Sequence, residues 1–240
     1  MLRGPVCGQA GLTGLRTKEN GEIAMSRVVC TLARFLRVLL VVFFLWQVLL
    51  RLVRRWVHFP APAFISVFLN SRFRRALQPP ADVVGWMDIR PGMQVLELGP
   101  GPGAFTVEAA RRAGPQGTVH AVDIQADMLE RLQETLAKAG VQNVSLHLSS
   151  AYALPVPDQS IDRLFMVTVL SEIPDKPRAL AEFRRVLKPG GLLAVGEFLP
   201  DPDFPRPVTV RRWCEAAGFR FVARYGTLLH YLMTFSVYGN

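Results

Sequence analysis

Residues 95–104 read Val-Leu-Glu-Leu-Gly-Pro-Gly-Pro-Gly-Ala, a short apolar strand that runs into a glycine-rich turn and then opens a helix. Gly99, Gly101 and Gly103 let the backbone approach a ligand closely and adopt conformations that are closed to other residues. Glu97 stands at the end of the strand, where its carboxylate would repel a pyrophosphate but attract an ammonium or sulfonium group. The stretch therefore predicts a binding site for the polar part of a nucleotide-like cofactor.

The pattern Glu-x-Gly-x-Gly-x-Gly of residues 97–103 resembles motif I of the class I S-adenosylmethionine (SAM) methyltransferases. Residues 119–123, Val-His-Ala-Val-Asp, continue the resemblance as a second strand that ends in an acid. Residues 185–191, Arg-Val-Leu-Lys-Pro-Gly-Gly, are similar to the family's helix-to-strand turn before strand five. The resemblance covers roughly residues 79–240. It is closest to the small-molecule and lipid methyltransferases typified by the ubiquinone and menaquinone biosynthesis enzymes.

The resemblance implies SAM as the cofactor and gives several positions a role. Asp123 would accept hydrogen bonds from both ribose hydroxyls. Ser150 stands where many relatives have an aspartate that holds the adenine amino group, and a hydroxyl is a shorter and weaker partner. The backbone N–H of Ala151 could still serve adenine. The predicted cofactor-binding residues are Glu97, Gly99, Gly101, Gly103, Asp123, Ile124, Met128, Ser150, Ala151 and Val167.

Three alternatives compete with a SAM enzyme. Residues 99–104 also satisfy the loose dinucleotide fingerprint Gly-x-Gly-x-x-Ala of nicotinamide or flavin oxidoreductases, although Glu97 and the Lys-Pro-Gly-Gly turn are not part of it. A purely structural turn would need fewer glycines and no acid at the next strand end. A non-catalytic SAM-fold module that scaffolds a membrane complex would not need Glu97, Asp123 and the glycines intact.

Apolar strands alternate with amphipathic helices after residue 79, which predicts a parallel sheet covered on both faces. Half of the 240 residues are hydrophobic, enough for one core of ordinary domain size. The expected fold is α/β, a Rossmann-like seven-stranded class I methyltransferase sheet preceded by an N-terminal hydrophobic helix. The predicted strands are 94–98, 119–123, 144–148, 162–167, 192–197, 219–225 and 232–237, and the predicted helices are 80–88, 104–112, 126–139, 177–187 and 210–217.

Charge is unevenly distributed along the chain. Residues 1–80 hold 12 Lys and Arg against 2 Asp and Glu, whereas residues 81–240 hold 16 against 17. The balanced enzyme region argues against a basic nucleic-acid groove. Three cysteines without metal-ligand spacing predict no metal site and fit a reducing cytosol, and the cysteine set of an arsenite methyltransferase is missing.

The basic leader predicts a membrane anchor. We expect a disordered segment at 1–25, with Met25 as a possible initiator, a hydrophobic helix at 26–58 and an amphipathic helix or lid at 59–78. Residues 38–50 contain one polar residue but span only about 20 Å as a helix, less than the ~30 Å hydrocarbon core. Extension to 32–53 adds arginines that can snorkel near the ends, so a spanning and an interfacial helix both remain open. The flanking charges place the enzyme on the cytoplasmic face.

Methyl transfer from a sulfonium needs alignment for in-line attack within about 3–3.5 Å more than it needs catalytic side chains. The expected acceptor is a hydrophobic small molecule or lipid, with a quinone precursor, an aminophospholipid and a sterol- or carotenoid-like compound all open. A phenol, enol or carbon nucleophile would also need a base. The candidate bases are Glu172, Glu197, His147, His230 and Tyr225. Glu172 follows the predicted fourth strand, where the resemblance places substrate groups, whereas His147 lies in the middle of a strand, as a structural residue would. The oligomeric state stays open.

Overall fold

The computed structural model describes residues 76–199, 201 and 204–237, together with 31, 34–39, 41–42, 44–46 and 49. The chain divides into two compact units, Met1–Val53 and Arg54–Asn240. In the first unit the described residues are helical and exposed. Among the described residues, no helix combines the length and apolar character that crossing a bilayer requires. The predicted disordered segment, most of the predicted lid and part of the predicted anchor lie outside the described residues.

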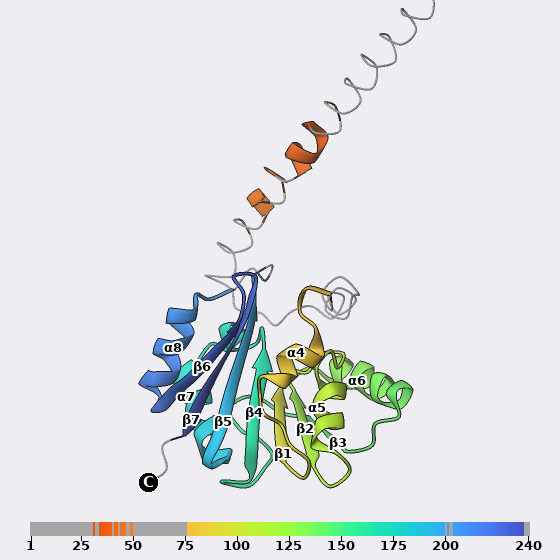
Figure 1. The fold of residues 1–240 in the computed structure, drawn as a ribbon, viewed down its shortest axis with the longest axis vertical. Helices are drawn as coiled ribbons and strands as arrows, with labels where there is room; N and C mark the ends of the chain where they lie inside the picture. The colour runs from red at the N-terminus through yellow and green to blue at the C-terminus, as the bar shows by residue number, and fades with distance from the viewer. Residues whose placement is uncertain are drawn as a thin grey trace, which may run out of the picture. The chain divides into compact units, whose positions relative to one another are not determined.

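The second unit contains a seven-stranded sheet with the order β3-β2-β1-β4-β5-β7-β6 (Figure 1). Neighbours among β1 to β5 pair in parallel, whereas β7 is antiparallel to both β5 and β6. The seven predicted strands are confirmed, but the sheet is mixed rather than parallel throughout, because β7 lies antiparallel between β5 and β6. The strands are β1 Gln94–Leu98, β2 Thr118–Asp123, β3 Val144–Leu148, β4 Ile161–Val167, β5 Leu187–Phe198, β6 Phe219–Gly226 and β7 His230–Val237.

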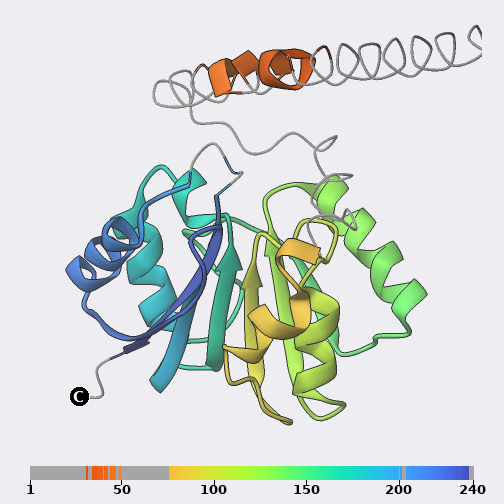
Figure 2. The same ribbon diagram turned by 45° about the horizontal axis from the view of Figure 1, so that its top comes forward.

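Helices cover both faces of this sheet (Figure 2). The helices are α4 Pro80–Gly85, α5 Thr106–Ala113, α6 Ala126–Ala139, α7 Lys176–Val186 and α8 Pro207–Ala216. Val84 of α4 and Ala109 of α5 share a buried cluster with Val95 of β1. Phe183 of α7 and Cys214 of α8 share another with Leu96, the next residue of β1. Because side chains alternate along a strand, the two clusters lie on opposite faces of the sheet.

Several predicted boundaries were wrong; the helix predicted at 80–88 ends at Gly85, and the helix predicted at 210–217 begins at Pro207. Residues 188–191 were expected to form a turn before strand five, but β5 already begins at Leu187, which pairs with Ile161. A register shift in β4 accommodates this early pairing, so the Gly-Gly pair is an irregularity inside a strand. The helix expected from residue 104 begins at Thr106, because residues 101–105 form turns. The helix predicted at 126–139 ends as expected at Gly140, whose φ is 65°.

Candidate functional site

The glycine turn follows β1 and is held to β2, because the Gly99 N–H donates to the carbonyl of Val122 at 2.8 Å. Gly99, Gly101 and Gly103 all have positive φ, at 65°, 53° and 89°. A Cβ atom at Gly99 would lie 2.5 Å from Cγ2 of Val169, and one at Gly103 would lie 2.6 Å from Cδ1 of Leu132. A Cβ atom at Gly101 would meet nothing within 4 Å. Gly99 and Gly103 are therefore required by packing, whereas Gly101 borders open space.

Asp123 ends β2 next to this turn and is 7% exposed. Its Oδ1 accepts a hydrogen bond from the Gln125 N–H at 3.0 Å. Burial raises the pKa of Asp123, while the backbone N–H groups of Gln125, Gly101 and Ile124 act in the opposite direction. The carboxylate thus joins the glycine turn to the end of β2. A ribose diol has two hydroxyl groups to donate, and a carboxylate offers two oxygens that can accept their hydrogen bonds.

Glu97 lies beneath the glycine turn and is 2% exposed. Within the described part of the chain its Oε2 has no hydrogen-bond partner. Burial raises the pKa of Glu97 to about 8, an effect that the Thr106 hydroxyl reduces and the charge of Asp123 increases. A buried carboxyl with one oxygen unpartnered favours a cation nearby, because the cation would stabilise the ionised form. This unsatisfied oxygen and the open space at Gly101 fit the cationic methionine end of SAM.

The other predicted cofactor residues lie near the carboxyl ends of β2, β3 and β4. Ile124 is 57% exposed directly after Asp123, as an apolar contact to a base would require. Met128 and Ala151 are buried, which leaves little of their side chains for a ligand. The Ser150 hydroxyl accepts a hydrogen bond from the Tyr152 N–H at 3.3 Å, so it already has a local partner. Val167 is the buried last residue of β4.

The segment after β4 contains the candidate base Glu172 together with two structural features that the sequence did not reveal. Thr168 has φ 59°, an outlier for a β-branched residue, and its N–H donates to the carbonyl of Gly196 on β5 at 2.8 Å. Val169 next fills the space that Gly99 leaves. Glu172 ends the short 3-10 helix Leu170–Glu172 that follows. No local sequence signal predicts the pairing of Val169 with Gly99, because 70 residues separate them.

Two of the five candidate bases face away from the glycine turn. Glu197 is fully buried and projects on the side of the sheet covered by α7 and α8. There the pKa of Tyr231 is raised above the usual range, mainly by burial and further by the charge of Glu197. Nε2 of His147 lies 3.3 Å from Nδ1 of His120, and Nε2 of His120 lies 3.2 Å from Oε1 of Gln94. His147 is thus part of a side-chain network across three strands, as a structural histidine would be.

Tyr225 and His230 instead lie on the face covered by α4, near the carboxyl end of β5. His230 is opposite Phe198, the last residue of β5. The Trp86 ring, just after α4, stacks with Tyr225 at 5.7 Å between centroids and with His230 at 5.9 Å. Burial lowers the pKa of His230, although Asp82 acts against this, so the neutral imidazole is favoured. The tertiary structure therefore builds an aromatic stack from two segments that are far apart in the sequence.

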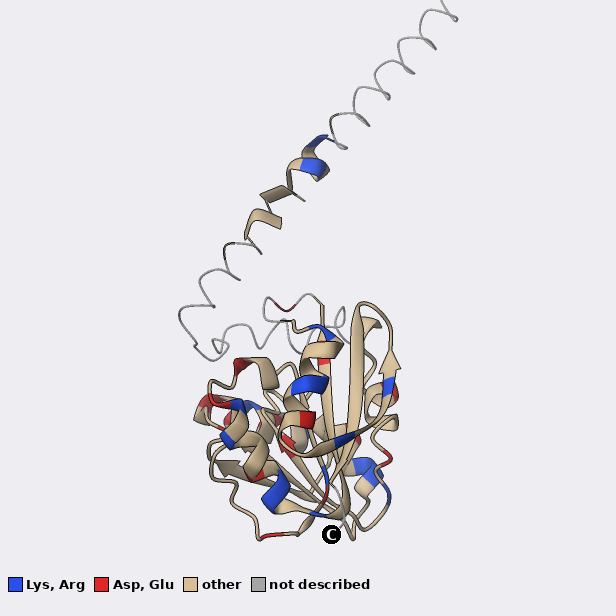
Figure 3. Ribbon diagram, turned by 90° about the vertical axis from the view of Figure 1, so that its left-hand side faces the viewer, with Lys and Arg blue, Asp and Glu red and all other residues tan. Residues whose placement is uncertain are grey.

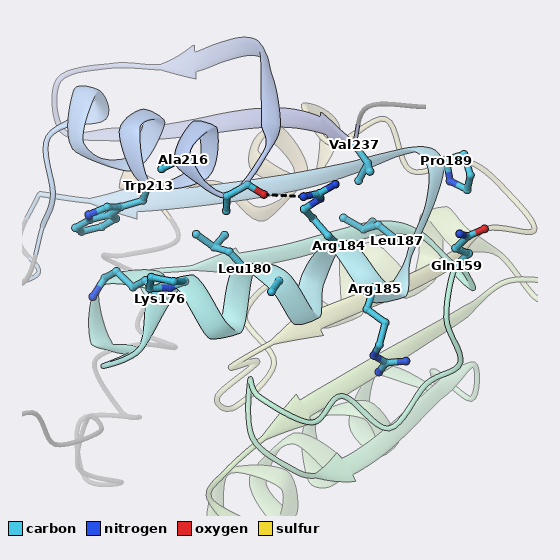
Figure 4. Close-up of a pocket in the computed structure, with 13 residues that line it drawn as sticks. Gln159, Lys176, Leu180, Arg184, Arg185, Leu187, Pro189, Trp213, Ala216 and Val237 are labelled. Atoms are coloured by element: carbon cyan, nitrogen blue, oxygen red, sulfur yellow. Dashed lines mark hydrogen bonds between the residues drawn. The ribbon is translucent and has the colours of Figure 1, made fainter. Parts of the chain in front are cut away.

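A groove of about 660 Å³ lies between α7 and α8 (Figure 4). Lys176, Leu180 and Arg184 line it from α7, and Trp213 lines it from α8. Arg184 spans the groove, because its Nη1 donates to the carbonyl of Ala217 at 3.2 Å. None of the predicted cofactor-binding residues contributes to this lining. The groove is therefore separate from the glycine turn.

Comparison with known proteins supports the same class. A family model described as a methyltransferase domain matches residues 89–230. The ubiquinone/menaquinone biosynthesis C-methyltransferase of Bordetella avium is 43% identical over 118 residues, which cover 49% of this chain and 46% of that protein. The protein of the same name from Shewanella halifaxensis is 37% identical over 141 residues, 58% of this chain and 55% of that protein. This chain spans about half the length of these curated relatives.

A crystal structure of a SAM dependent methyltransferase from Aquifex aeolicus matches with a TM-score of 0.70 and 25% identity, and covers 74% of this chain and 100% of that one. The family model matches more than half of the chain. The chain therefore belongs to the family of methyltransferase domains, and its sheet order and glycine turn make it a class I, SAM-dependent member. This assignment replaces the nicotinamide or flavin alternative.

The buried Glu97 makes stability depend on pH. In the unfolded chain its pKa is near 4.5, whereas in the folded, cofactor-free protein it is about 8. Between these values only the folded state keeps the proton, so the free energy of unfolding should fall as pH rises to about 8 and then level off. The total loss should be on the order of 5 kcal/mol, since each pH unit between the two pKa values contributes about 1.4 kcal/mol. Urea unfolding of the cofactor-free protein across this range measures it.

Glu97→Gln should remove most of this pH slope, because glutamine does not titrate. Glu134→Gln is the control, since the Glu134 side chain is 71% exposed on α6. It should leave the slope unchanged. A Glu97→Gln protein that keeps the wild-type slope would contradict a proton on Glu97.

Gly101→Val should abolish SAM binding and leave the sheet folded, because the new side chain enters open space where the cofactor is expected. The positive φ should cost about 1–2 kcal/mol of stability. Gly140→Val is a matched control, since Gly140 also has positive φ and open space but lies at the end of α6. Calorimetry should find SAM binding in the control only. Tight binding by Gly101→Val would exclude the glycine turn as the cofactor site.

Proposed function

We propose that this chain transfers a methyl group from SAM to a hydrophobic small molecule or lipid, with a quinone precursor as the favoured acceptor, at the cytoplasmic face of a membrane. The main support is the unsatisfied, buried Glu97 carboxyl beside the open Gly101 turn and Asp123. The curated relatives named above are quinone C-methyltransferases by name, which favours a quinone-type acceptor. Their sequences match over only part of their length, so the acceptor is inferred.

In this proposal, some residues of the chain bind SAM and others position the acceptor. Glu97 would balance the positive charge of the cofactor, and Asp123 would orient its ribose. When bound, SAM supplies a methyl group that is already attached to a good leaving group. The chain then has to hold the acceptor atom in line with that methyl group and exclude water. Val167 and Thr168, at the end of β4, stand beside the glycine turn and would border the acceptor.

The aromatic stack of Trp86, Tyr225 and His230 supports a planar acceptor, because aromatic side chains pack well against flat rings. A quinone precursor would need to lose a proton when carbon is methylated. Glu172, Tyr225 and His230 remain as candidate bases, since each lies near the carboxyl end of a strand that borders the site. A neutral His230 has a ring nitrogen able to accept that proton.

Methyl transfer to a demethylated, isoprenoid-tailed hydroquinone tests this function. The full-length protein with methyl-labelled SAM should give a labelled product, identified by mass spectrometry.

Asp123→Ala should weaken SAM affinity by about 10- to 150-fold, the loss of 1.5–3 kcal/mol for hydrogen bonds to a charged group. Asp127→Ala, which removes an exposed carboxylate from α6, is the control. SAM binding without transfer to any hydroquinone, aminophospholipid or sterol acceptor would favour the non-catalytic scaffold.

The membrane location rests on the leader. Phe35, Val38, Leu45 and Trp46 are each more than half exposed in the first unit, a surface that water alone would disfavour. We expect the full-length protein to sediment with membranes and a form without residues 1–57 to become soluble while it keeps its SAM affinity. Release of the full-length protein by carbonate would indicate an interfacial helix, and retention would indicate a spanning one. A full-length protein that is soluble without detergent would contradict a membrane anchor.

A further inference from the structure

Large apolar side chains are exposed at the turn between β6 and β7. Leu228 is 85% exposed and Leu229 is 49% exposed. Leu199, which follows β5 and is 38% exposed, lies beside them because its N–H donates to the carbonyl of Leu229 at 2.7 Å. We call these three residues the leucine tip. Such a group of exposed apolar side chains is typical of an interaction surface.

The leucine tip is held in a defined turn. The Thr227 N–H donates to the carbonyl of His230 at 2.7 Å, and the Leu229 N–H donates to the Thr227 hydroxyl at 3.1 Å. Gly226 has φ 97°, and a Cβ atom there would lie 2.5 Å from the carbonyl oxygen of His230. The backbone therefore presents Leu228 outward as part of its folded geometry.

Basic side chains accompany the leucine tip. Of the five arginines in residues 204–237, Arg206 and Arg224 belong to the segments at this end, whereas the other three lie along α8 or at the opposite end of β6 (Figure 3 views the side of α8 and β6, with Lys and Arg in blue). Arg224 is exposed on β6 next to the turn, and its Nη2 donates to the carbonyl of Thr227 at 3.4 Å. Arg206 is exposed at the start of α8, which the Tyr231 hydroxyl fixes to the same end by donating to the Pro205 carbonyl at 2.7 Å.

The turn lies at the functional end of the sheet (Figure 1). His230 begins β7 opposite Phe198, the last residue of β5, so the leucine tip is at the edge where the parallel strands end. Three side chains on a projecting turn are too few for the ~1,000 Å² that a stable protein interface buries. An apolar tip flanked by guanidinium groups is instead suited to a lipid interface, because the leucines can contact the acyl chains while the guanidinium groups contact the phosphates of the headgroups.

We propose that the leucine tip docks on an anionic lipid bilayer, with Leu228 and Leu229 among the upper acyl chains and Arg206 and Arg224 at the lipid phosphates. This contact rests on the proposed function, because it would turn the cofactor edge of the sheet toward a membrane-borne acceptor. It is separate from the leader, since every contributing residue belongs to the second unit. The enzyme domain would then take a fixed orientation on the membrane.

A fluorescent label at the tip tests the docking directly. Leu228→Cys in the full-length protein is labelled with nitrobenzoxadiazole, with Cys7 and Cys30 replaced by serine and Cys214 left because it is fully buried. Vesicles of phosphatidylcholine with phosphatidylglycerol should shift the emission to the blue and increase it. A label at Gln116→Cys, in the exposed turn between α5 and β2 at the other end of the sheet, should not respond.

Charge provides the second arm of the test. Arg206→Gln with Arg224→Gln should shift the equilibrium between docked and undocked tip by about fivefold per arginine, and pure phosphatidylcholine vesicles should have a similar effect. A silent Leu228 label on protein that sediments with the vesicles would overturn the docking. Emission that is already blue-shifted without vesicles would also overturn it, because another part of the chain or a second copy would cover the tip. Neither readout needs an acceptor, so failure of methyl transfer is distinguishable.

Discussion

Hydrogen bonds between parallel strands bring the ends of β1, β2 and β4 to one edge of the sheet, because these strands run in the same direction. The glycine turn and the acids proposed to bind the cofactor all lie at or next to this edge. Glu97 pairs with Ala121 on one side and Phe165 on the other, so the carboxyl is set at a fixed depth below the glycine turn. Asp123, at the end of β2, therefore contacts the glycine turn after β1, although helix α5 separates them in the sequence.

The same geometry places an acid where folding alone would not favour one. Glu97 is buried on the face of the sheet that α5 covers, and among the described residues its Oε2 has no hydrogen-bond partner. Ionisation of this carboxyl is therefore unfavourable unless a cation binds nearby. An apolar residue there would give a more stable sheet. A buried carboxyl that destabilises the ligand-free protein is typical of a binding site, where a loss of folding stability accompanies a gain in ligand affinity.

The three glycines of the turn are needed for different physical reasons. At Gly99 and Gly103 a side chain would collide with Val169 and Leu132, so these glycines are needed for packing as well as for positive φ. At Gly101 no protein atom is near, and only the backbone conformation and a ligand restrict the position. The motif thus combines two positions that packing requires with one that borders open space.

The sequence by itself determined the order of strands and helices, the glycine turn and the acids at the ends of β1 and β2. Local periodicity, glycine and strand-end position carry that information within a few residues. Only the tertiary structure decided the raised pKa of Glu97, the outward face of Gly101, the separation of Glu197 from the site and the stacking of Trp86 on the hairpin. These features depend on contacts between residues far apart in the chain, and no local pattern specifies such contacts.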